Sequence, residues 1–318
     1  MNLCIVGYGS IAEVHRRSFA RIPGVEIGAV VGRLLEPTQA FAEKCGAPLA
    51  TVNLAEALAR DDIDAVVITS PSAKHAAQTQ AALEAGKHVL VEIPLALTLA
   101  ESESLTALAE QQDRTLMVAH TMRFWPTLTA ARQRIAEGEL HAHSVFLHYG
   151  FLRRENVNWQ GRRRSWTDNL LWHHGCHAVD TALWLLGEPA EAVAGYMGPP
   201  HKELGIPLDL AVSLRTPRGQ VVSCALSYNT MRPLLDILVI GEETTLAVRN
   251  GRLVDPIDQI IAAGGENEEA SAVYLQNIEF ITALRQEREP LVSGEAVLPT
   301  MRALQAVQDL NPQNPHQR

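Results

Sequence analysis

The chain is poor in cysteine and contains no long apolar run. Its 4 cysteines, at positions 4, 45, 176 and 224, form no CxxC pair and no disulfide framework, a usage that favours a reducing cytoplasm. No apolar stretch reaches the roughly 20 residues that a membrane-spanning helix needs. No cationic leader precedes the first apolar run, "LCIVG". We therefore expect a cytoplasmic protein that does not bind membranes.

Basic residues are also outnumbered by acidic ones. The 27 Lys and Arg against 36 Asp and Glu give a net charge of −9, which argues against nucleic acid or an anionic membrane as the main partner. The hydrophobic fraction of 47% and the charged fraction of 20% are typical of a globular protein. A length of 318 residues exceeds a typical single core and predicts two domains.

Short apolar runs alternate with helical patterns through the first part of the chain. The runs at 3–7, 25–32, 65–70, 87–92 and 115–120 are apolar almost throughout, as expected for strands that are buried on both faces. This order predicts an α/β domain with a doubly wound parallel sheet, a Rossmann domain, over residues 1–121.

After Pro126 the pattern changes to longer strands with partial alternation. Turn signals at 217–219, Gly241 and 250–251 separate these strands. We therefore predict an α+β domain built on a mainly antiparallel sheet over residues 122–318. The stretch 256–268 is predicted to be a loop.

The string "GYGSIA" follows the first strand and opens the first helix. In this GxGxxA spacing Gly7 makes the tight turn, Gly9 lets the backbone approach a pyrophosphate, and Ala12 packs the helix on the strand. Ser10 and Ile11 begin the helix, whose N-terminus would face the phosphates. A glycine turn of purely structural use is the alternative, but the setting within a strand–helix series favours dinucleotide binding.

The end of the second strand distinguishes the two nicotinamide cofactors. An acidic residue there would bind the ribose 2′-hydroxyl of NAD and repel the 2′-phosphate of NADP. This chain has "VVGRLLE", which puts Gly32 and Arg33 at that place. A small residue followed by a guanidinium favours NADP, with NAD as the alternative.

Several strings together resemble one family of oxidoreductases. They are the N-terminal fingerprint, "TSPSAKHAAQ", "AGKHVLVEIPLA" and "GCHAVD", in this order along essentially the whole chain. They are similar to those of the glucose–fructose oxidoreductase, inositol dehydrogenase and rhizopine-catabolism family, Gfo/Idh/MocA. The resemblance implies hydride transfer to a nicotinamide and a homodimer or homotetramer formed through the C-terminal sheet. It further implies cofactor contacts from Ser70, Pro71, His75, Glu92 and Ile93.

Two positions depart from the family pattern. The family usually reads Glu-Lys-Pro where this chain has Glu92-Ile93-Pro94, and isoleucine cannot donate, accept or carry charge. The family also commonly has aspartate four residues before its catalytic histidine, where this chain has His173 ahead of His177. The usual sugar-dehydrogenase constellation is therefore incomplete.

The string "LLWHHGCHAVD" carries the predicted acid/base chemistry. On a helix His173, His177 and Asp180 share a face, whereas His174 lies off it. His177 matches the family histidine and is predicted to be the general base, with His173 sharing the proton and Asp180 orienting an imidazole. Two imidazoles at this spacing also suit zinc, but the sequence offers no third ligand of fitting spacing, so we expect no metal.

Both departures are shared with one branch of the family. The strings "HTMRF", "FLRRENVN", "RRSWTDNLLWHHGCHAVD" and "KELGIPLD" resemble a branch that uses NADP to oxidise the cyclic hemiacetal of a carboxylated semialdehyde to a lactone. A carboxylated substrate needs cations and, for a flat ring, apolar walls. The residues predicted to contact it are His120, Arg123, Arg154 (or its neighbour Arg153), Arg164, Trp166, Trp172 and His174.

Two other function classes remain open from the sequence. A sugar or polyol dehydrogenase with a rearranged site would share the architecture and the fingerprint. A non-catalytic sensor that only binds the dinucleotide would explain the loss of the family lysine. The retained histidines and the arginines between 153 and 164 favour an enzyme with an acidic substrate.

Overall fold

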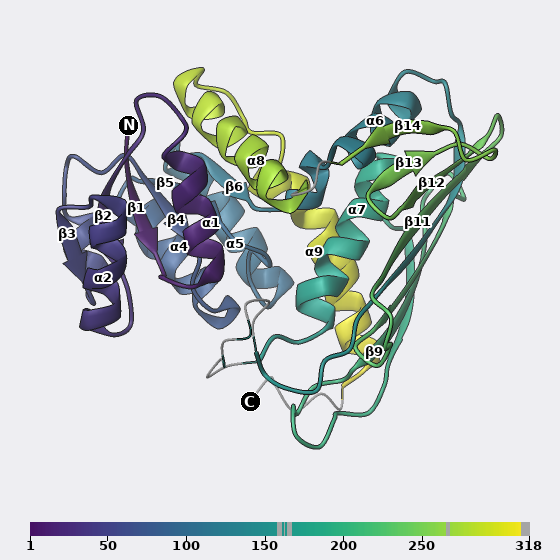
Figure 1. Cartoon of the computed structure of the whole chain (residues 1–318), viewed down its shortest axis with the longest axis horizontal. Helices are drawn as coiled ribbons and strands as arrows, with labels where there is room; N and C mark the ends of the chain where they lie inside the picture. The colour runs from purple at the N-terminus through teal and green to yellow at the C-terminus, as the bar shows by residue number, and fades with distance from the viewer. Residues whose placement is uncertain (158–160, 162, 164–166, 265–267, 313–318) are drawn as a thin grey trace. The chain divides into compact units, whose positions relative to one another are not determined.

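The computed structural model describes residues 1–157, 161, 163, 167–264 and 268–312 (Figure 1). The chain forms two compact units. Unit 1 comprises Met1–His120 and Val273–Leu298, and unit 2 comprises Thr121–Ala272 and Pro299–Arg318. From the sequence we predicted that residues 122–318 form the second domain. In the structure the segment Val273–Leu298 belongs to unit 1.

Unit 1 contains a parallel six-stranded sheet in the order β3-β2-β1-β4-β5-β6. Its strands are β1 (Asn2–Val6), β2 (Glu26–Val31), β3 (Leu49–Thr51), β4 (Ala65–Ile68), β5 (His88–Val91) and β6 (Leu116–Val118). The strand order reverses between β1 and β4. In such sheets ligands bind outside the carboxyl ends of the strands at this switch point. The predicted parallel α/β sheet is confirmed, with the three-residue edge strand β3 as an addition.

The helices between Met1 and His120 alternate with the strands, and a short polar residue or a glycine caps some of them. They are α1 (Ser10–Phe19), α2 (Leu35–Cys45), α3 (Leu54–Leu58), η1 (Ser72–Lys74), α4 (His75–Glu84) and α5 (Leu99–Gln111). The Asn53 side chain caps α3 and the Thr98 side chain caps α5, each accepting a backbone N–H of the first turn. Gly46 ends α2 in the left-handed conformation.

A segment from the end of the chain completes unit 1. It contains most of α8 (Glu268–Arg285) and the start of α9 (Gly294–Leu310). Between the two helices the carbonyl of Val292 accepts the backbone N–H of Val118, at 2.9 Å. This bond ties the returning segment to β6.

Unit 2 is built on an eight-stranded sheet in the order β14-β13-β12-β11-β7-β10-β9-β8. Its strands are β7 (Ala142–Gly150), β8 (Ala192–Met197), β9 (Asp209–Arg215), β10 (Val221–Ser227), β11 (Leu234–Gly241), β12 (Thr245–Arg249), β13 (Arg252–Val254) and β14 (Ile260–Ala263). Every pair is antiparallel except β7 with β10. The mainly antiparallel sheet is confirmed. The loop predicted at 256–268 contains the short strand β14.

Helices of unit 2 pack on one face of this sheet, and the other face, called the open face below, exposes alternate residues of β8, β9 and β10. The helices of unit 2 are η2 (Thr121–Phe124), α6 (Pro126–Ala136), η3 (Leu171–Gly175), α7 (Cys176–Leu186) and the end of α9. Among them α7 contacts β7 and β10, and α6 contacts β12, β13 and β14. β9 alternates exposed and buried residues along its whole length, as expected for a strand covered on one side. No helix among the described residues is both long and apolar enough to cross a bilayer.

Candidate active site

The glycine-rich turn between β1 and α1 has the geometry that a dinucleotide needs. Gly7 has φ +117°, and a Cβ there would lie 2.6 Å from Thr69 Oγ1, so only glycine fits. A Cβ on Gly9 would meet no protein atom within 4 Å. Gly9 is also the N-cap of α1 and has no side chain to satisfy the first N–H groups, while Ala12 is fully buried. The open backbone and the uncapped helix fit a pyrophosphate.

The carboxyl end of β2 leaves room for no side chain at Gly32. A Cβ there would lie 2.1 Å from Thr38 Oγ1 and 2.5 Å from the Tyr8 ring, so an acidic residue could not occupy this position without moving both. The next residue, Arg33, is exposed and forms no ion pair within the part of the chain that the structure describes. The exposed Arg33 guanidinium therefore lies at the end of β2, the position that contacts the ribose 2′ group in dinucleotide-binding folds.

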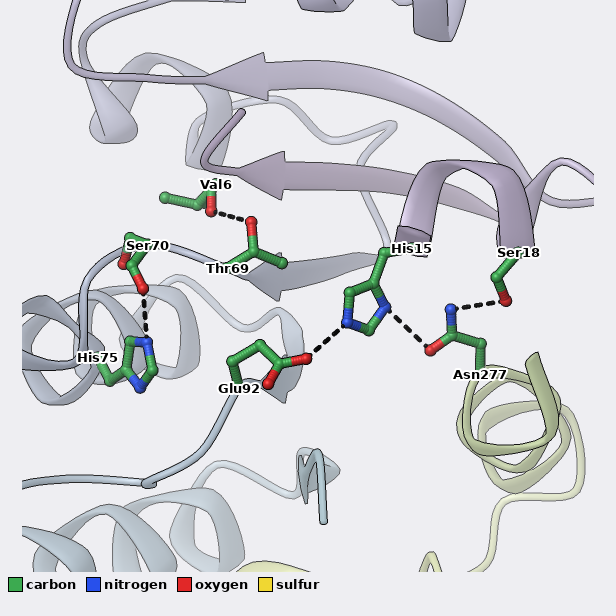
Figure 2. Close-up of polar contacts among 8 residues, drawn as sticks. All are labelled: Val6, His15, Ser18, Thr69, Ser70, His75, Glu92 and Asn277. Carbon is green, nitrogen blue, oxygen red and sulfur yellow. Dashed lines mark hydrogen bonds and ion pairs between the residues drawn. The ribbon is translucent and has the colours of Figure 1, made fainter. Parts of the chain in front are cut away.

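His75 anchors two loops of the cofactor half rather than facing open space. Its ring is 1% exposed, with Nδ1 2.7 Å from the carbonyl of Pro94 and Nε2 2.8 Å from the carbonyl of Ser70. Both partners are backbone carbonyl oxygens, which accept hydrogen bonds (Figure 2 draws the contact with Ser70). His75 thereby fixes the loop after β4, which holds Ser70 and Pro71, against the loop after β5.

A buried polar chain leads from α8 to the end of β5 (Figure 2). Asn277 Nδ2 donates to Ser18 Oγ at 2.8 Å, so its Oδ1 faces His15 Nδ1 at 3.1 Å. The other ring nitrogen of His15 lies 2.9 Å from Glu92 Oε1. His15 and Asn277 are fully buried, so this chain fixes the Glu92 carboxylate at the predicted cofactor site. Neither His15 nor Asn277 was predicted from the sequence, although His15 stands only three residues after the fingerprint's Ala12.

Ile93 is 4% exposed and packs in the core. It therefore gives the site no polar group at the family's lysine position. Among the described residues no group of three or more His, Cys, Asp and Glu side chains is arranged to hold a metal.

In unit 2 the three histidines form one cluster at the start of α7. Leu171–Gly175 is a π-helical turn rather than an α-helical one, and such turns are frequent at functional sites. The ring centroids of His173 and His177 lie 6.2 Å apart, and those of His173 and His174 lie 4.3 Å apart. The structure therefore brings His174 into the cluster, although the expected α-helix put it off the shared face.

Asp180 is held by two side chains of unit 2. Arg123 donates to both carboxylate oxygens, at 2.9 and 2.6 Å, and Thr300 donates to Oδ1 at 3.0 Å. The side chains of Arg123 and Asp180 are only 8% and 1% exposed. In the structure the Arg123 guanidinium, predicted to hold a substrate carboxylate, thus holds a protein carboxylate. The pair fixes α7, the helix that carries His177.

Tyr228 links the histidines to the arginine-rich segment after β7. Its fully buried hydroxyl hydrogen-bonds His174 Nδ1, and its ring lies 5.2 Å from the Arg153 guanidinium. Arg154, the predicted substrate contact, is exposed and donates to the backbone carbonyls of Arg153 and Tyr228, at 3.0 and 3.1 Å. Arg153, not Arg154, is the buried cation next to this cluster.

The remaining predicted substrate contacts fall in different surroundings. His120 is 1% exposed and follows β6 at its carboxyl end. Trp172 is 4% exposed, and its indole N–H donates to Gln308 Oε1 at 3.2 Å, which places it in the core of unit 2. Arg164 and Trp166 lie outside the described residues.

Comparison with known proteins shows the family to which the chain belongs. Residues 1–120 match the family described as "Oxidoreductase family, NAD-binding Rossmann fold", and residues 126–265 match "Bacterial oxidoreductases, C-terminal". The chain belongs to the Gfo/Idh/MocA family of oxidoreductases. Unit 1 is therefore its NAD-binding Rossmann domain, and the resemblance noted from the sequence is confirmed.

Two curated relatives differ widely in their similarity to this chain. It is 37% identical over 305 residues to a 4-carboxy-2-hydroxymuconate-6-semialdehyde dehydrogenase of Sphingobium sp., covering 96% of both chains. It is 26% identical over 301 residues to a 1,5-anhydro-D-fructose reductase of Ensifer adhaerens, covering 92% of this chain and 90% of that one. The chain is thus an oxidoreductase whose relatives include dehydrogenases.

Solved structures share the fold at lower identity. An oxidoreductase of Agrobacterium radiobacter, in complex with NAD⁺, L-tartaric acid and magnesium, superposes with a TM-score of 0.88 at 17% identity, covering 98% of this chain and 96% of that one. The WlbA dehydrogenase of Bordetella pertussis, in complex with NADH and UDP-GlcNAcA, gives 0.85 at 23% identity, covering 97% and 94%.

Proposed function

We propose that this chain is an NADP-dependent dehydrogenase that oxidises a carboxylated semialdehyde, in its cyclic hemiacetal form, to a lactone. The substrate is 4-carboxy-2-hydroxymuconate-6-semialdehyde or a close analogue, and the product is 2-pyrone-4,6-dicarboxylate or its counterpart. The observation that carries this proposal is the 37% identity, over 96% of both chains, to the dehydrogenase of that name.

The chemistry suits the side chains of the histidine cluster. The hemiacetal carbon loses a hydride and its hydroxyl loses a proton. The C–O bond thereby becomes the carbonyl of the lactone, and no water is consumed. The bound cofactor supplies the hydride acceptor. His177 takes the hydroxyl proton as general base, and His173, with its ring centroid 6.2 Å away, supports it. A hemiacetal hydroxyl is more acidic than that of an alcohol, so the apolar Ile93 is compatible with this reaction.

Two features of unit 1 support NADP as the cofactor. The position that would hold an acidic residue for a ribose 2′-hydroxyl is Gly32, where a side chain would have to displace Thr38 and Tyr8. The exposed Arg33, which has no acidic partner among the described residues, can bind a 2′-phosphate with its guanidinium. NAD is the alternative.

We further propose that the open face of the eight-stranded sheet joins copies of this chain into a homodimer or homotetramer. The face exposes apolar side chains, among them Tyr196 (79%), Val221 (44%) and Leu234 (38%), and such surface is favourable to bury. Sedimentation of the protein with and without Tyr196→Lys would test this. We also propose a cytoplasmic location, which the small number of cysteines, 4 in 318 residues, supports.

Steady-state assays of the purified protein test the proposed reaction. NADP or NAD is mixed with the semialdehyde, with aldoses or with inositols, and reduced cofactor is followed by absorbance. We expect rapid reduction of NADP with the semialdehyde alone. Turnover of sugars in its place would establish the sugar or polyol dehydrogenase, for which the 26% identical reductase is the precedent. Tight cofactor binding without any turnover would establish a sensor.

A further inference from the structure

Arg153 is a buried cation with an unsatisfied donor. Its side chain is 7% exposed and follows β7 in an irregular segment. Nη2 donates to Asn156 Oδ1 at 3.1 Å, and the guanidinium carbon lies 5.2 Å from the Tyr228 ring centroid. Nε is buried and has no acceptor, and Arg153 forms no ion pair within the described part of the chain.

The contrast with Arg123 shows what is missing. Arg123 is buried to a similar degree, and its fork is filled by both oxygens of Asp180. Removing a guanidinium from water is costly unless an anion compensates it. Arg153 Nε, which has no acceptor, lies on the same edge of the guanidinium as Nη2, which has a second N–H besides the one donated to Asn156. These two donors match the two oxygens of one planar carboxylate.

The surroundings of Arg153 are those of a binding site for a flat acid. The Tyr228 hydroxyl bonds His174, whose ring stacks on Tyr149 at 4.7 Å and meets Phe151 edge-on at 5.5 Å. Tyr149 and Phe151, the two rings that contact His174, also line a hollow of about 280 Å³ in unit 2, just below the usual volume of small-molecule sites. Arg153 is not part of the lining of this hollow. Burial raises the pKa of the Tyr228 phenol well above its usual value; Arg153 opposes this, and Tyr149 and Asp168 add to it. The phenol therefore stays neutral beside the cation.

We propose that Arg153, steadied by Asn156 and the Tyr228 ring, binds one carboxylate of the substrate and holds its ring beside Tyr149 and Phe151. This inference rests on the proposed function only in taking the carboxylate to be the substrate's. Arg154, whose exposed side chain bonds backbone carbonyls, has no such role. Arg153 is thus a specificity-determining residue for acidic substrates.

A binding titration tests the site without requiring turnover. Isophthalate, a planar ring with two carboxylates, is titrated calorimetrically into the full-length protein saturated with NADP. We expect Arg153→Gln to raise the Kd at least about tenfold, because charge-assisted hydrogen bonds are lost. Arg154→Gln, the matched control from the next position, should change it less than about twofold. Arg153→Lys, which keeps the charge without the fork, should lie between the two.

Each outcome decides the proposal. An unchanged Kd in Arg153→Gln would overturn it, as would an absence of saturable isophthalate binding to the wild type. Inorganic phosphate that competes as strongly as isophthalate would overturn the carboxylate assignment. If Arg153→Gln fails to fold, Arg153→Lys and Asn156→Leu carry the same comparison. Isophthalate binding that needs Arg153, in a protein that does not oxidise the semialdehyde, would refute the proposed reaction and leave this site standing.

Discussion

Two buried histidines of unit 1 and one buried arginine of unit 2 differ in how far the protein satisfies their polar atoms. In unit 1 the rings of His15 and His75 are almost fully buried, and every ring nitrogen faces a protein oxygen. In unit 2 the Nε of Arg153 is equally buried and has no acceptor.

This difference separates two roles that the residue types alone do not distinguish. A polar group whose partners are all provided by the protein holds the backbone in place, as His75 does for the loops after β4 and β5. A buried charge whose partners are incomplete has capacity left for a ligand. The comparison therefore predicts where substitutions change stability and where they change binding or turnover.

The largest effect is expected from His177→Asn, which removes the proposed base. General-base catalysis contributes about 10²–10⁴-fold, so kcat should fall by at least about 100-fold. The affinity for NADP, measured by fluorescence titration, should hardly change. His143→Asn, an exposed histidine of β7, serves as the control and should keep full activity. An active His177→Asn enzyme would transfer the role to His173 or His120.

The next effect contrasts the two buried arginines. Arg123→Met leaves the Asp180 carboxylate buried without its guanidinium and should lower the free energy of unfolding by about 3–5 kcal/mol. Arg153→Met removes a cation that has no carboxylate partner among the described residues, so the loss should stay under about 1.5 kcal/mol. Urea denaturation of both variants measures this difference. Equal losses of unfolding free energy would show that a carboxylate partner does not decide how much each arginine contributes to stability.

A smaller effect tests the exposed cation at the end of β2. Arg33→Asp should weaken NADP binding by about 1–3 kcal/mol, because a charge-assisted hydrogen bond to the 2′-phosphate is replaced by repulsion. NAD binding should hardly change. Lys44→Asp, also exposed and near the end of α2, is the control. An equal loss for both cofactors, or a wild type that prefers NAD, would refute the assignment.

Local patterns predicted most of the fold, because neighbouring residues alone identify the fingerprint and the apolar runs of strands that are buried on both faces. The parallel order of unit 1 and the turn at Gly7 and Gly9 follow from them. The three-residue strand β3 and the strand β14 were missed because such short edge strands show no periodicity.

The site depended more on contacts that the sequence does not display. Asn277 reaches His15 across 262 positions, and no local pattern links them. The π-helical turn at Leu171–Gly175 places His174 in the cluster, whereas α-helical periodicity puts it outside. Arg153 and Arg154 are adjacent in an irregular segment, so neither periodicity nor composition could tell which one is buried.

The smallest effect is expected for an ion pair that is partly exposed to solvent, that of Glu13. Glu13 in α1 is 23% exposed and accepts from Arg16 and Arg17, at 2.7 and 2.6 Å. The hydrogen bond from Arg16, reinforced by Arg17, lowers the pKa of Glu13 from 4.5 to about 2. Since the folded state has the lower pKa, the stabilisation is present above the ordinary value and is lost as pH falls from about 5 towards 2.

Glu13→Gln should therefore cost less than about 1 kcal/mol at neutral pH, because solvent screens the pair. The difference from wild type should shrink below about pH 3, and also at roughly 1 M salt. Thermal unfolding of both proteins across this pH range measures it. A loss as large as that of Arg123→Met would show that burial does not decide how much these pairs contribute, and the contrast between Arg123 and Arg153 would then need another cause.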